Sequence, residues 1–422
     1  MIFFGTDGIR GKAYKSLPLI RSYQLGYALN EIFKESKVVI GYDTRESSLD
    51  FLNALIQGLS KKNIEVAGVV TTPMIALHSK LESCLGVMIT ASHNPYYDNG
   101  LKVFLNGKKI SNELIKKIES IMLKVKEFVS EKVRFEISND TKRHYLNFVE
   151  KLNLKMTFDD YVIDAANGSA YNISKNLFNG KIYFDTPNGT NINKDCGCTS
   201  ITTINQINTK KKVSFSFDGD GDRVLMTLNK KVIYGDQITY IIVRDMIEKG
   251  NFPNVALSIM TNQGVIKAFK KKNVKIVEVD VGDKNIIREI TKNNVELGSE
   301  PSGHIILNYG NNIYLGDGVL IARKIIDIIS RKGIKKIISW LGEISLIPIK
   351  TVNFKISKQI LEHEDVKKCL NEIINKKEEN DKIVVRPSGT EDLVRVTVSS
   401  ETKKNQETII QNIEKCLIGE KL

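Results

Sequence analysis

The segment VSFSFDGDGDRVLMTL, residues 213–228, places a loop with three aspartates between two apolar runs. The runs VSFSF and VLMTL have the length and composition of strands, so the segment predicts a strand, a loop and a second strand. Asp218, Asp220 and Asp222 alternate with glycines, which let the backbone turn without a side chain in the way. Three carboxylates at the mouth of one loop are typical of a Mg²⁺ site.

Two other structures use a similar pattern. A calcium-binding EF-hand loop needs glycine at its sixth position and glutamate at its twelfth, where this chain has Arg223 and Asn229. The sequence therefore excludes an EF-hand. A plain hairpin turn stays open from this segment alone, because Asp-Gly pairs are the commonest hairpin signal.

A second candidate loop follows the apolar run VMIT and contains Ser92, His93, Asn94 and Pro95. Pro95 prevents a helix from continuing, so the sequence predicts that Ser92 is exposed on a turn. No acyl-transfer motif of the G-x-S-x-G type surrounds this serine. A phosphorylated serine would instead supply oxygens that complete the shell of a cation held by the aspartates. A turn that closes a surface loop is the alternative.

The third candidate loop is RPSGTE, residues 386–391, between the β-rich runs KIVV and LVRVTVSS. It offers a guanidinium and two hydroxyls around a glycine, a set that suits a phosphate dianion. Arg395 alternates with apolar neighbours on the next predicted strand and is placed to reach the same anion. A hairpin without a ligand is again the alternative.

Together the three loops predict phosphoryl transfer without a nucleotide, because the chain lacks the G-x-x-x-x-G-K-[ST] loop of nucleotide triphosphatases. With six further segments in the same order, they resemble the α-D-phosphohexomutases, and most of all the bacterial branch that acts on glucosamine phosphates. The nine segments are FGTDGIRG at 4–11, GYDTR at 41–45, TASHNPYYDNGLKVF at 90–104, NGTNINKDCG at 188–197, FDGDGDRV at 217–224, GDQI at 235–238, VGDKN at 281–285, GSEPSGH at 298–304 and RPSGTEDLVRV at 386–396.

The resemblance implies a role for each site residue, in four groups. The phosphorylated serine is Ser92, and one of its phosphate oxygens would bind one Mg²⁺ together with Asp218, Asp220 and Asp222. The residues around the transferring phosphoryl group are Arg10, His93, Asn94, Lys102 and Arg223. The sugar-binding residues are Lys284, Glu300, Ser302 and His304. The residues that hold the second phosphate are Arg386, Ser388, Gly389, Thr390 and Arg395.

Lys102 is the candidate for proton transfer to or from the sugar hydroxyl. It would qualify if it were desolvated beside other cations, because both effects lower the pKa of an amine. A solvated strand lysine is the alternative for Lys102, and a plain turn residue is the alternative for His304. Pro301 differs from the glutamine or asparagine usual in the glucosamine branch, whereas the DNG turn at 98–100 favours that branch.

Strand and helix patterns alternate along the 422 residues, which favours an α/β fold. The pattern begins at 38–43 and starts again three times, so we expect four domains. The resemblance implies three similar α/β mixed-sheet domains and a smaller C-terminal α+β domain around a central cleft. The predicted domains carry the phosphoserine, metal, sugar and phosphate loops in turn, at residues 1–138, 139–234, 235–343 and 344–422.

Composition narrows the class of protein. Hydrophobic residues make up 41% of the chain, enough for ordinary cores, and no apolar run has the length of a membrane span or signal peptide. Five scattered cysteines predict reduced thiols and a cytoplasmic location, and Cys196 and Cys198 lack nearby partners for zinc. The net charge of +13 comes from lysines spread along the chain, so we expect no nucleic-acid or membrane partner.

We therefore expect a cytoplasmic isomerase, a monomer or homodimer, that interconverts glucosamine 6-phosphate and glucosamine 1-phosphate. The resemblance implies Mg²⁺, a phosphoserine, a transient sugar bisphosphate as activator, and a place in amino-sugar supply for UDP-N-acetylglucosamine and peptidoglycan precursors. A phosphoglucomutase or phosphomannomutase is the alternative within the family. A non-catalytic sugar-phosphate binding protein is the alternative of another class, and the intact SHNP and DGDGDR motifs argue against it.

Overall fold

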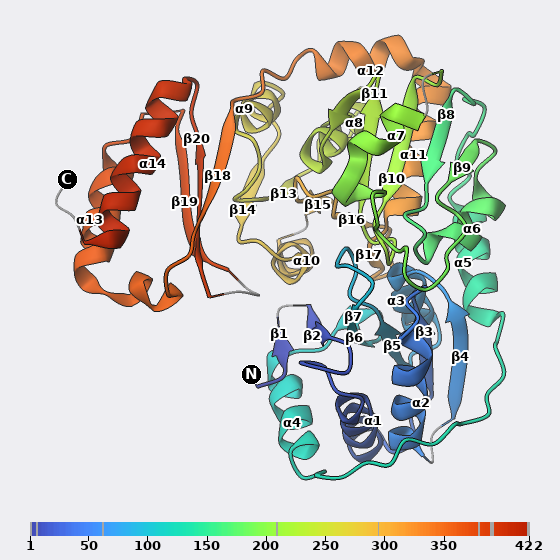
Figure 1. The fold of residues 1–422 in the computed structure, drawn as a ribbon. Coiled ribbons are helices and arrows are strands. Elements are labelled where there is room, and N and C mark those ends of the chain that lie inside the picture. The colour runs from blue at the N-terminus through green and yellow to red at the C-terminus, as the bar shows by residue number, and fades with distance from the viewer. Residues whose placement is uncertain are drawn as a thin grey trace.

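The computed structural model describes residues 2–5, 7–60, 63–207, 210–293, 295–378, 380–388 and 392–419. Its elements form four sheets in succession along the chain, each covered by helices (Figure 1). The four-domain α/β architecture is confirmed. The domain boundaries given above stay a prediction.

The first sheet has the strand order β1-β2-β6-β5-β3-β4, with β7 paired to β6. Successive side chains of β3 enter the cores on its two faces, because strand residues alternate. Val38 and Ile40 pack in the core with α1, α2 and α4, and Val39 packs in the core with α3. The elements of this domain are β1 Phe4–Gly5, β2 Gly8–Lys12, α1 Ile20–Ile32, β3 Val38–Tyr42, α2 Ser48–Leu59, β4 Ile64–Val69, α3 Thr72–Leu81, β5 Leu85–Ile89, β6 Asp98–Leu105, β7 Lys108–Lys109 and α4 Asn112–Met122.

The second and third sheets repeat one topology, with the orders β12-β11-β10-β8-β9 and β17-β16-β15-β13-β14. In each, the first strand pairs in parallel with the second and third, and the third pairs antiparallel with the fourth. Strands β3 to β6 of the first sheet are related in the same way. The expected likeness of the first three domains is therefore confirmed.

The strands of these two sheets are β8 Tyr161–Asp164, β9 Lys181–Tyr183, β10 Val213–Phe217, β11 Val224–Leu228, β12 Lys231–Ile233, β13 Val255–Ser258, β14 Ile276–Val279, β15 Leu297–Ser299, β16 Ile305–Asn308 and β17 Tyr314–Gly316. Helix α5, Asp140–Lys151, leads from the first domain into the second. The remaining helices of this part are α6 Ala170–Leu177, η1 Cys198–Ser200, α7 Ile201–Ile207, α8 Gly235–Glu248, α9 Gln263–Lys271, α10 Asp283–Lys292, α11 Gly318–Lys332 and α12 Ile334–Leu341.

The fourth domain has a three-stranded sheet of order β18-β20-β19 and its own hydrophobic core. It lies to one side of the other three, beyond α9, α10 and β14 (Figure 1). Lys267 pairs with Glu401 at 3.3 Å, and Lys382 pairs with Glu278, so ion pairs join it to the third domain. Its elements are β18 Ile349–Phe354, η2 Lys358–Glu362, α13 Glu364–Asn375, β19 Lys382–Pro387, β20 Val394–Ser399 and α14 Lys403–Ile418.

Two predictions about local structure need correction. Cys369 on α13 and Cys416 on α14 form a disulfide, with Cα atoms 5.8 Å apart, although the sequence predicted only reduced thiols. The two helices pack side by side in the same core, which brings the distant cysteines together. The sequence pattern over residues 49–62 predicts a helix, but helix α2 ends at Leu59, and residues 61–62 lie outside the described residues.

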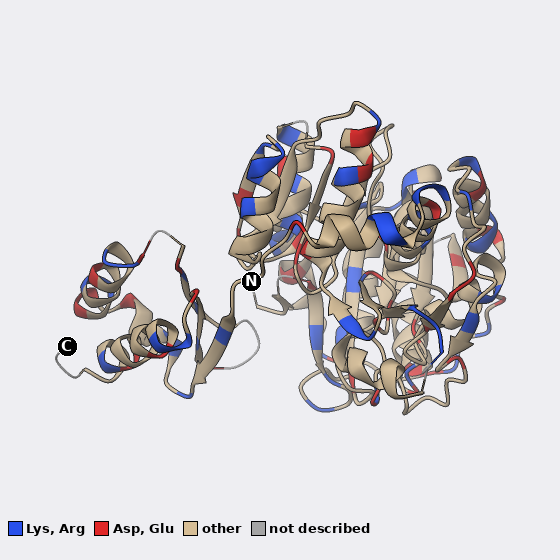
Figure 2. Ribbon diagram, turned by 90° about the horizontal axis from the view of Figure 1, so that it is seen from above, with Lys and Arg blue, Asp and Glu red and all other residues tan. Residues whose placement is uncertain are grey.

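Basic residues occur on helices and strands of all four domains and alternate with acidic ones (Figure 2). This distribution agrees with the diffuse basic surface expected from the sequence. Among the described residues, no helix combines the length and apolar character needed to cross a membrane. The predicted absence of nucleic-acid and membrane partners, the cytoplasmic location and the oligomeric state stay predictions.

Candidate active site

Three equivalent loops meet at one point. The first three sheets share a unit of four strands, and in each unit the loop between the third and fourth strands carries one of the predicted motifs: these loops are β5–β6, β10–β11 and β15–β16. Ser92, after β5, donates its hydroxyl hydrogen to Asp218 Oδ2 in the β10–β11 loop at 2.8 Å. Val224, at the end of that loop, donates its backbone N–H to the carbonyl of Gly303 in the β15–β16 loop at 3.0 Å. The repeated topology thus brings the serine, the aspartates and the EPSGH loop together.

Ser92 is buried, with 1% of its surface exposed, so the prediction of an exposed turn was wrong in that respect. The turn itself is present, because Ser92 has a φ of 54°. The β10–β11 loop covers it closely: a side chain on Gly219 would place its Cβ 2.5 Å from the Ser92 carbonyl oxygen. The sequence alone could not show that a loop of another domain packs on this turn.

The three aspartates form a cluster that fits a divalent cation. One carboxylate oxygen from each lies within 4.8 Å of the others, and all three residues are buried. Asp220 Oδ1 and Asp222 Oδ1 are buried without a hydrogen-bond partner. Buried carboxylate oxygens normally have partners, and hard oxygen ligands of this kind are those that Mg²⁺ prefers. The donor set therefore fits the metal that the sequence predicted.

Lys102 on β6 lies against this cluster, with 1% of its surface exposed. Its Nζ donates to Asp220 Oδ2 at 2.7 Å and to Asp222 Oδ2 at 3.1 Å, and it lies 3.3 Å from Asp7 Oδ2. Burial would lower the pKa of Lys102, but these three carboxylates raise it well above its ordinary value. One condition for a lowered pKa is met, because Lys102 is buried, but the other is not, because its nearest charged groups are carboxylates rather than cations.

Neighbouring charges shift the pKa values of Asp218 and Asp222 in opposite directions. Burial, followed by the charges of Asp222 and Asp220, raises the pKa of Asp218 well above its ordinary value. Burial would also raise the pKa of Asp222, but Lys102 and other basic neighbours bring it below that value. Burial, then Arg223, lowers the pKa of His93 to about 4, so its ring is neutral near pH 7.

The other residues expected around the phosphoryl group lie close by. Arg10 pairs with Asp7, and its buried Nε has no hydrogen-bond partner. Arg223 donates its backbone N–H to Asp218 Oδ1 at 3.1 Å, and its side-chain Nε is likewise buried without a partner. Asn94 donates its side-chain N–H to Asp98 at 2.9 Å. Two guanidinium groups thus retain free donors beside the serine and the aspartates.

A chain of charges that the sequence reasoning missed links the first and third domains. Asp7 accepts hydrogen bonds from Arg10 and Lys109, and Lys109 Nζ lies 2.5 Å from Asp283 Oδ2 at the start of α10. The basic groups around Asp7 hold its pKa well below the ordinary value although burial opposes this. Asp7 lies in FGTDGIRG and Asp283 in VGDKN, two of the nine segments that carry the family resemblance, so the sequence offered a signal for both residues. Lys109 lies in none of these segments.

Arg45 and Asn193 fix the backbone of the serine turn and were also missed. The Arg45 guanidinium is fully buried, pairs with Asp43 at 2.9 Å, and donates to the carbonyls of Ser92 and Asn94, each at 2.9 Å. Asn193 Nδ2 donates to the same two carbonyls at 2.9 Å and 3.1 Å. Arg45 ends the segment GYDTR and Asn193 lies in NGTNINKDCG, two segments to which the resemblance assigned no site residue.

We expect Arg45→Lys to lower kcat by roughly ten- to a hundredfold and to change KM by less than about twofold, because an ammonium cannot reach both carbonyls and Asp43. Steady-state kinetics on the sugar phosphate would measure this, and Arg45→Met should lower kcat further. Arg143→Lys, on the exposed face of α5, is the matched control. An unchanged kcat, or a change confined to KM, would contradict the positioning role of Arg45.

The EPSGH loop is held by its own side chains. Glu300 Oε1 accepts the backbone N–H of Gly282 at 2.8 Å, and its Oε2 accepts the Ser302 hydroxyl at 3.2 Å. His304 lines a small cavity with Asp222 and Asp283. The half-buried Lys284 follows Asp283 on α10, and burial, then Lys109, lowers its pKa. The loop therefore presents a carboxylate, a hydroxyl and an imidazole, and the start of α10 presents an amine.

In the fourth domain, Arg386 on β19 and Arg395 on β20 are cross-strand partners. Burial, then the charge of Arg395, lowers the pKa of Arg386, and Arg386 Nε is buried without a hydrogen-bond partner. Ser388 is buried and donates its backbone N–H to the carbonyl of Leu393 at 2.9 Å. Gly389 and Thr390 lie outside the described residues. Two adjacent guanidiniums on neighbouring strands are suited to an anion.

Family models identify the family to which this chain belongs. Models of the phosphoglucomutase/phosphomannomutase family match residues 1–128 as α/β/α domain I, 234–344 as α/β/α domain III and 351–415 as the C-terminal domain. The chain therefore belongs to the phosphohexomutase family of isomerases, and the resemblance predicted from the sequence is confirmed.

Among curated relatives, the phosphoglucosamine mutases of Thermotoga petrophila and Geobacillus thermodenitrificans are each 33% identical to this chain. The alignments cover 98% of this chain and 99% of the first relative, and 97% of both chains for the second. A solved phosphoglucomutase/phosphomannomutase family protein from Burkholderia thailandensis has a TM-score of 0.79 at 18% identity, over 99% of this chain and 97% of that one. A solved N-acetylglucosamine-phosphate mutase has a TM-score of 0.62 at 17% identity, over 98% and 96%.

Proposed function

We propose that this protein interconverts glucosamine 6-phosphate and glucosamine 1-phosphate through a phosphorylated Ser92 and a bisphosphorylated sugar. The observation that carries the proposal is the buried Ser92 hydroxyl, 2.8 Å from Asp218 where the three equivalent loops meet. The phosphoglucosamine mutases that match this chain over nearly its whole length support the amino sugar as substrate.

The reaction exchanges one P–O bond for another. The free hydroxyl of the sugar phosphate attacks the phosphoryl group on Ser92, the serine P–O bond breaks, and a sugar bisphosphate forms. After the bisphosphate has turned over in the site, its other phosphoryl group returns to Ser92, and the isomeric monophosphate leaves. Such transfers depend on positioning and on neutralisation of charge more than on covalent help.

The residues of the site are suited to both tasks. Mg²⁺ held by Asp218, Asp220 and Asp222 with a phosphate oxygen on Ser92 would neutralise charge on the transferring group. The unpartnered guanidinium donors of Arg10 and Arg223, together with His93 and Asn94, complete our proposed set around that group.

We assign proton exchange with the sugar hydroxyl to Lys102. When the sugar hydroxyl attacks the phosphoryl group on Ser92, the neutral amine of Lys102 accepts its proton, and the resulting ammonium returns a proton to the sugar oxygen when the other phosphoryl group goes back to Ser92. Because the neighbouring carboxylates raise the pKa of Lys102 in this structure, the first transfer requires Lys102 to lose its proton before the hydroxyl attacks. Its contacts with Asp220 and Asp222 place Lys102 in the same loop cluster in which Ser92 contacts Asp218.

Two further groups would hold the rest of the substrate. We assign the sugar ring to the EPSGH loop and its neighbours, and the second phosphate to the hairpin of the fourth domain. Each phosphate occupies that hairpin in turn, since either one can be the group that does not react. The sugar group comprises Lys284, Glu300, Ser302 and His304. The phosphate group comprises Arg386, Ser388, Gly389, Thr390 and Arg395.

Coupled assays on three hexose phosphates test the substrate. A site that binds the C2 ammonium leaves its polar partners unpaired when a hydroxyl replaces it, so we expect kcat/KM for glucosamine 6-phosphate to exceed that for glucose or mannose 6-phosphate by at least about a hundredfold. A preference below roughly tenfold, or a reversed one, would favour a phosphoglucomutase or phosphomannomutase instead.

A further inference from the structure

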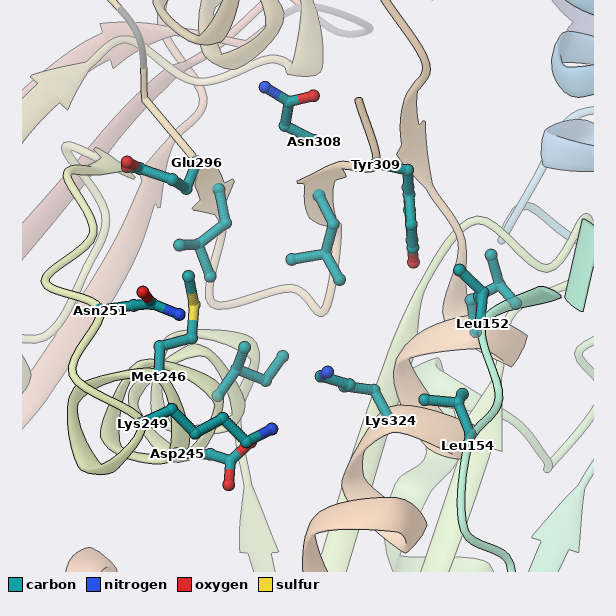
Figure 3. Close-up of a pocket in the computed structure, with 14 residues that line it drawn as sticks. Leu152, Leu154, Asp245, Met246, Lys249, Asn251, Glu296, Asn308, Tyr309 and Lys324 are labelled. Carbon is teal, nitrogen blue, oxygen red and sulfur yellow. The ribbon is translucent and has the colours of Figure 1, made fainter. Parts of the chain in front are cut away.

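A cavity of about 350 Å³ lies away from the serine loop, where the second and third domains meet (Figure 3). It is bounded by α8, by α11, by the segment after α5 and by the β15–β16 hairpin. Small-molecule sites typically have volumes of roughly 300–1,000 Å³ and mainly apolar linings. Most of this lining is apolar, as in such sites, and includes Leu152, Leu154, Ile242, Met246, Leu307 and Leu320.

Lys324 supplies the polar group of this cavity. It is half-buried on α11, and its amine points into the space between Met246 and Leu154 (Figure 3). Among the described residues, it makes no hydrogen bond or ion pair. Burial, then the charge of Lys249, lowers the pKa of Lys324, although the charges of Asp327 and Asp245 oppose this.

The acidic residues of the lining are engaged elsewhere. Both oxygens of Asp245 accept hydrogen bonds from Arg331 at 2.9 Å, and Lys249 Nζ pairs with Asp245 at 2.9 Å. Glu296 turns its carboxylate away from the centre of the cavity (Figure 3) and accepts the backbone N–H of Asn254 at 2.6 Å. Of the two lysines that line the cavity, Lys249 pairs with Asp245, whereas Lys324 is available to pair with an anionic ligand.

We propose that this cavity binds a small molecule with an apolar body and one carboxylate, which pairs with the ammonium of Lys324. The apolar lining would bury the body, and a monoanion matches a single ammonium. A phosphate dianion fits less well, since it calls for several converging donors and would lie near two carboxylates.

The cavity is connected to the sugar loop by two strands. Leu297 and Leu307 line it and are direct partners on β15 and β16, and the partners Ser299 and Ile305 on the same strands enclose the EPSGH loop. A ligand that shifts the first pair acts on the strands that carry Glu300. This step depends on the proposed function, and it predicts that an occupied cavity changes KM for glucosamine 6-phosphate.

Binding of octanoate to the purified full-length chain, measured by calorimetry, tests the site itself without reference to the mutase reaction. We expect saturable binding that Lys324→Met weakens by about tenfold or more, while the same variant changes octanol binding by less than about twofold. Lys249→Met is the matched control, because that lysine already pairs with Asp245, and its octanoate affinity should stay within about twofold.

A second variant separates binding from folding. Leu154→Trp should fill the cavity and abolish binding of both octanoate and octanol while the thermal unfolding midpoint is retained. Octanoate binding that is absent in the wild type, or that survives Lys324→Met or Leu154→Trp unchanged, would overturn the site. Binding with an unchanged KM for the sugar phosphate would overturn the connection to the sugar loop and leave the site standing.

Discussion

Ser92→Ala should lower mutase activity by about a thousandfold or more, because the variant lacks the hydroxyl that accepts and returns the phosphoryl group. Intact-mass measurement should find one phosphate on part of the purified wild-type protein and none on the variant. The substitution is small: Ser92 is buried, and Asp218, which accepts its hydroxyl hydrogen, keeps the backbone N–H of Arg223 as a partner.

A matched control distinguishes this effect from loss of a buried hydroxyl. Ser79 is also buried in the first domain, where its hydroxyl donates to the carbonyl of Cys84 at 2.6 Å. Ser79→Ala should retain the phosphate adduct and keep its activity within about threefold, since a neutral buried hydrogen bond contributes only about 1 kcal/mol. A Ser92→Ala protein with undiminished turnover would exclude the phosphoserine mechanism.

Much of the fold could be predicted from local pattern. Apolar runs such as those of β3, β8 and β10 identified strands because they are buried on both faces. The likeness of the first three domains was known only through the resemblance, because it consists of strand order and pairing rather than of residue identity. The disulfide between Cys369 and Cys416 was missed because it depends on how α13 packs against α14.

For the site, as for the fold, the sequence predicted which residues each loop contains but not which residues surround them. Motifs assigned the serine, the aspartates and the lysine to one predicted site, and the structure brings these residues together, while their roles stay a prediction. They could not show that Ser92 is buried, nor that carboxylates rather than cations determine the pKa of Lys102. Burial and pairing arise between domains, where residues more than a hundred positions apart come into contact, as Lys102 and Asp220 do.

The metal cluster yields the second large effect. Asp220→Asn keeps the size of the side chain but removes a charge from a buried carboxylate whose Oδ1 has no hydrogen-bond partner. If this oxygen binds Mg²⁺, kcat should fall by roughly a hundredfold or more, because charge on the transferring phosphoryl group is no longer neutralised. A chelator should silence the wild type, and added Mg²⁺ should restore it.

Thermal unfolding gives a measure of the metal that does not depend on activity. A ligand that binds only the folded state raises its unfolding midpoint, so Mg²⁺ should stabilise the wild type and leave Asp220→Asn unaffected. Asp160→Asn, a carboxylate of the same domain outside the cluster, should respond to Mg²⁺ as the wild type does. Full activity in excess chelator would show that the cation is not required for the reaction. Equal stabilisation of Asp220→Asn and the wild type by Mg²⁺ would show that the cation binds elsewhere. Neither result is compatible with a catalytic metal held by these three aspartates.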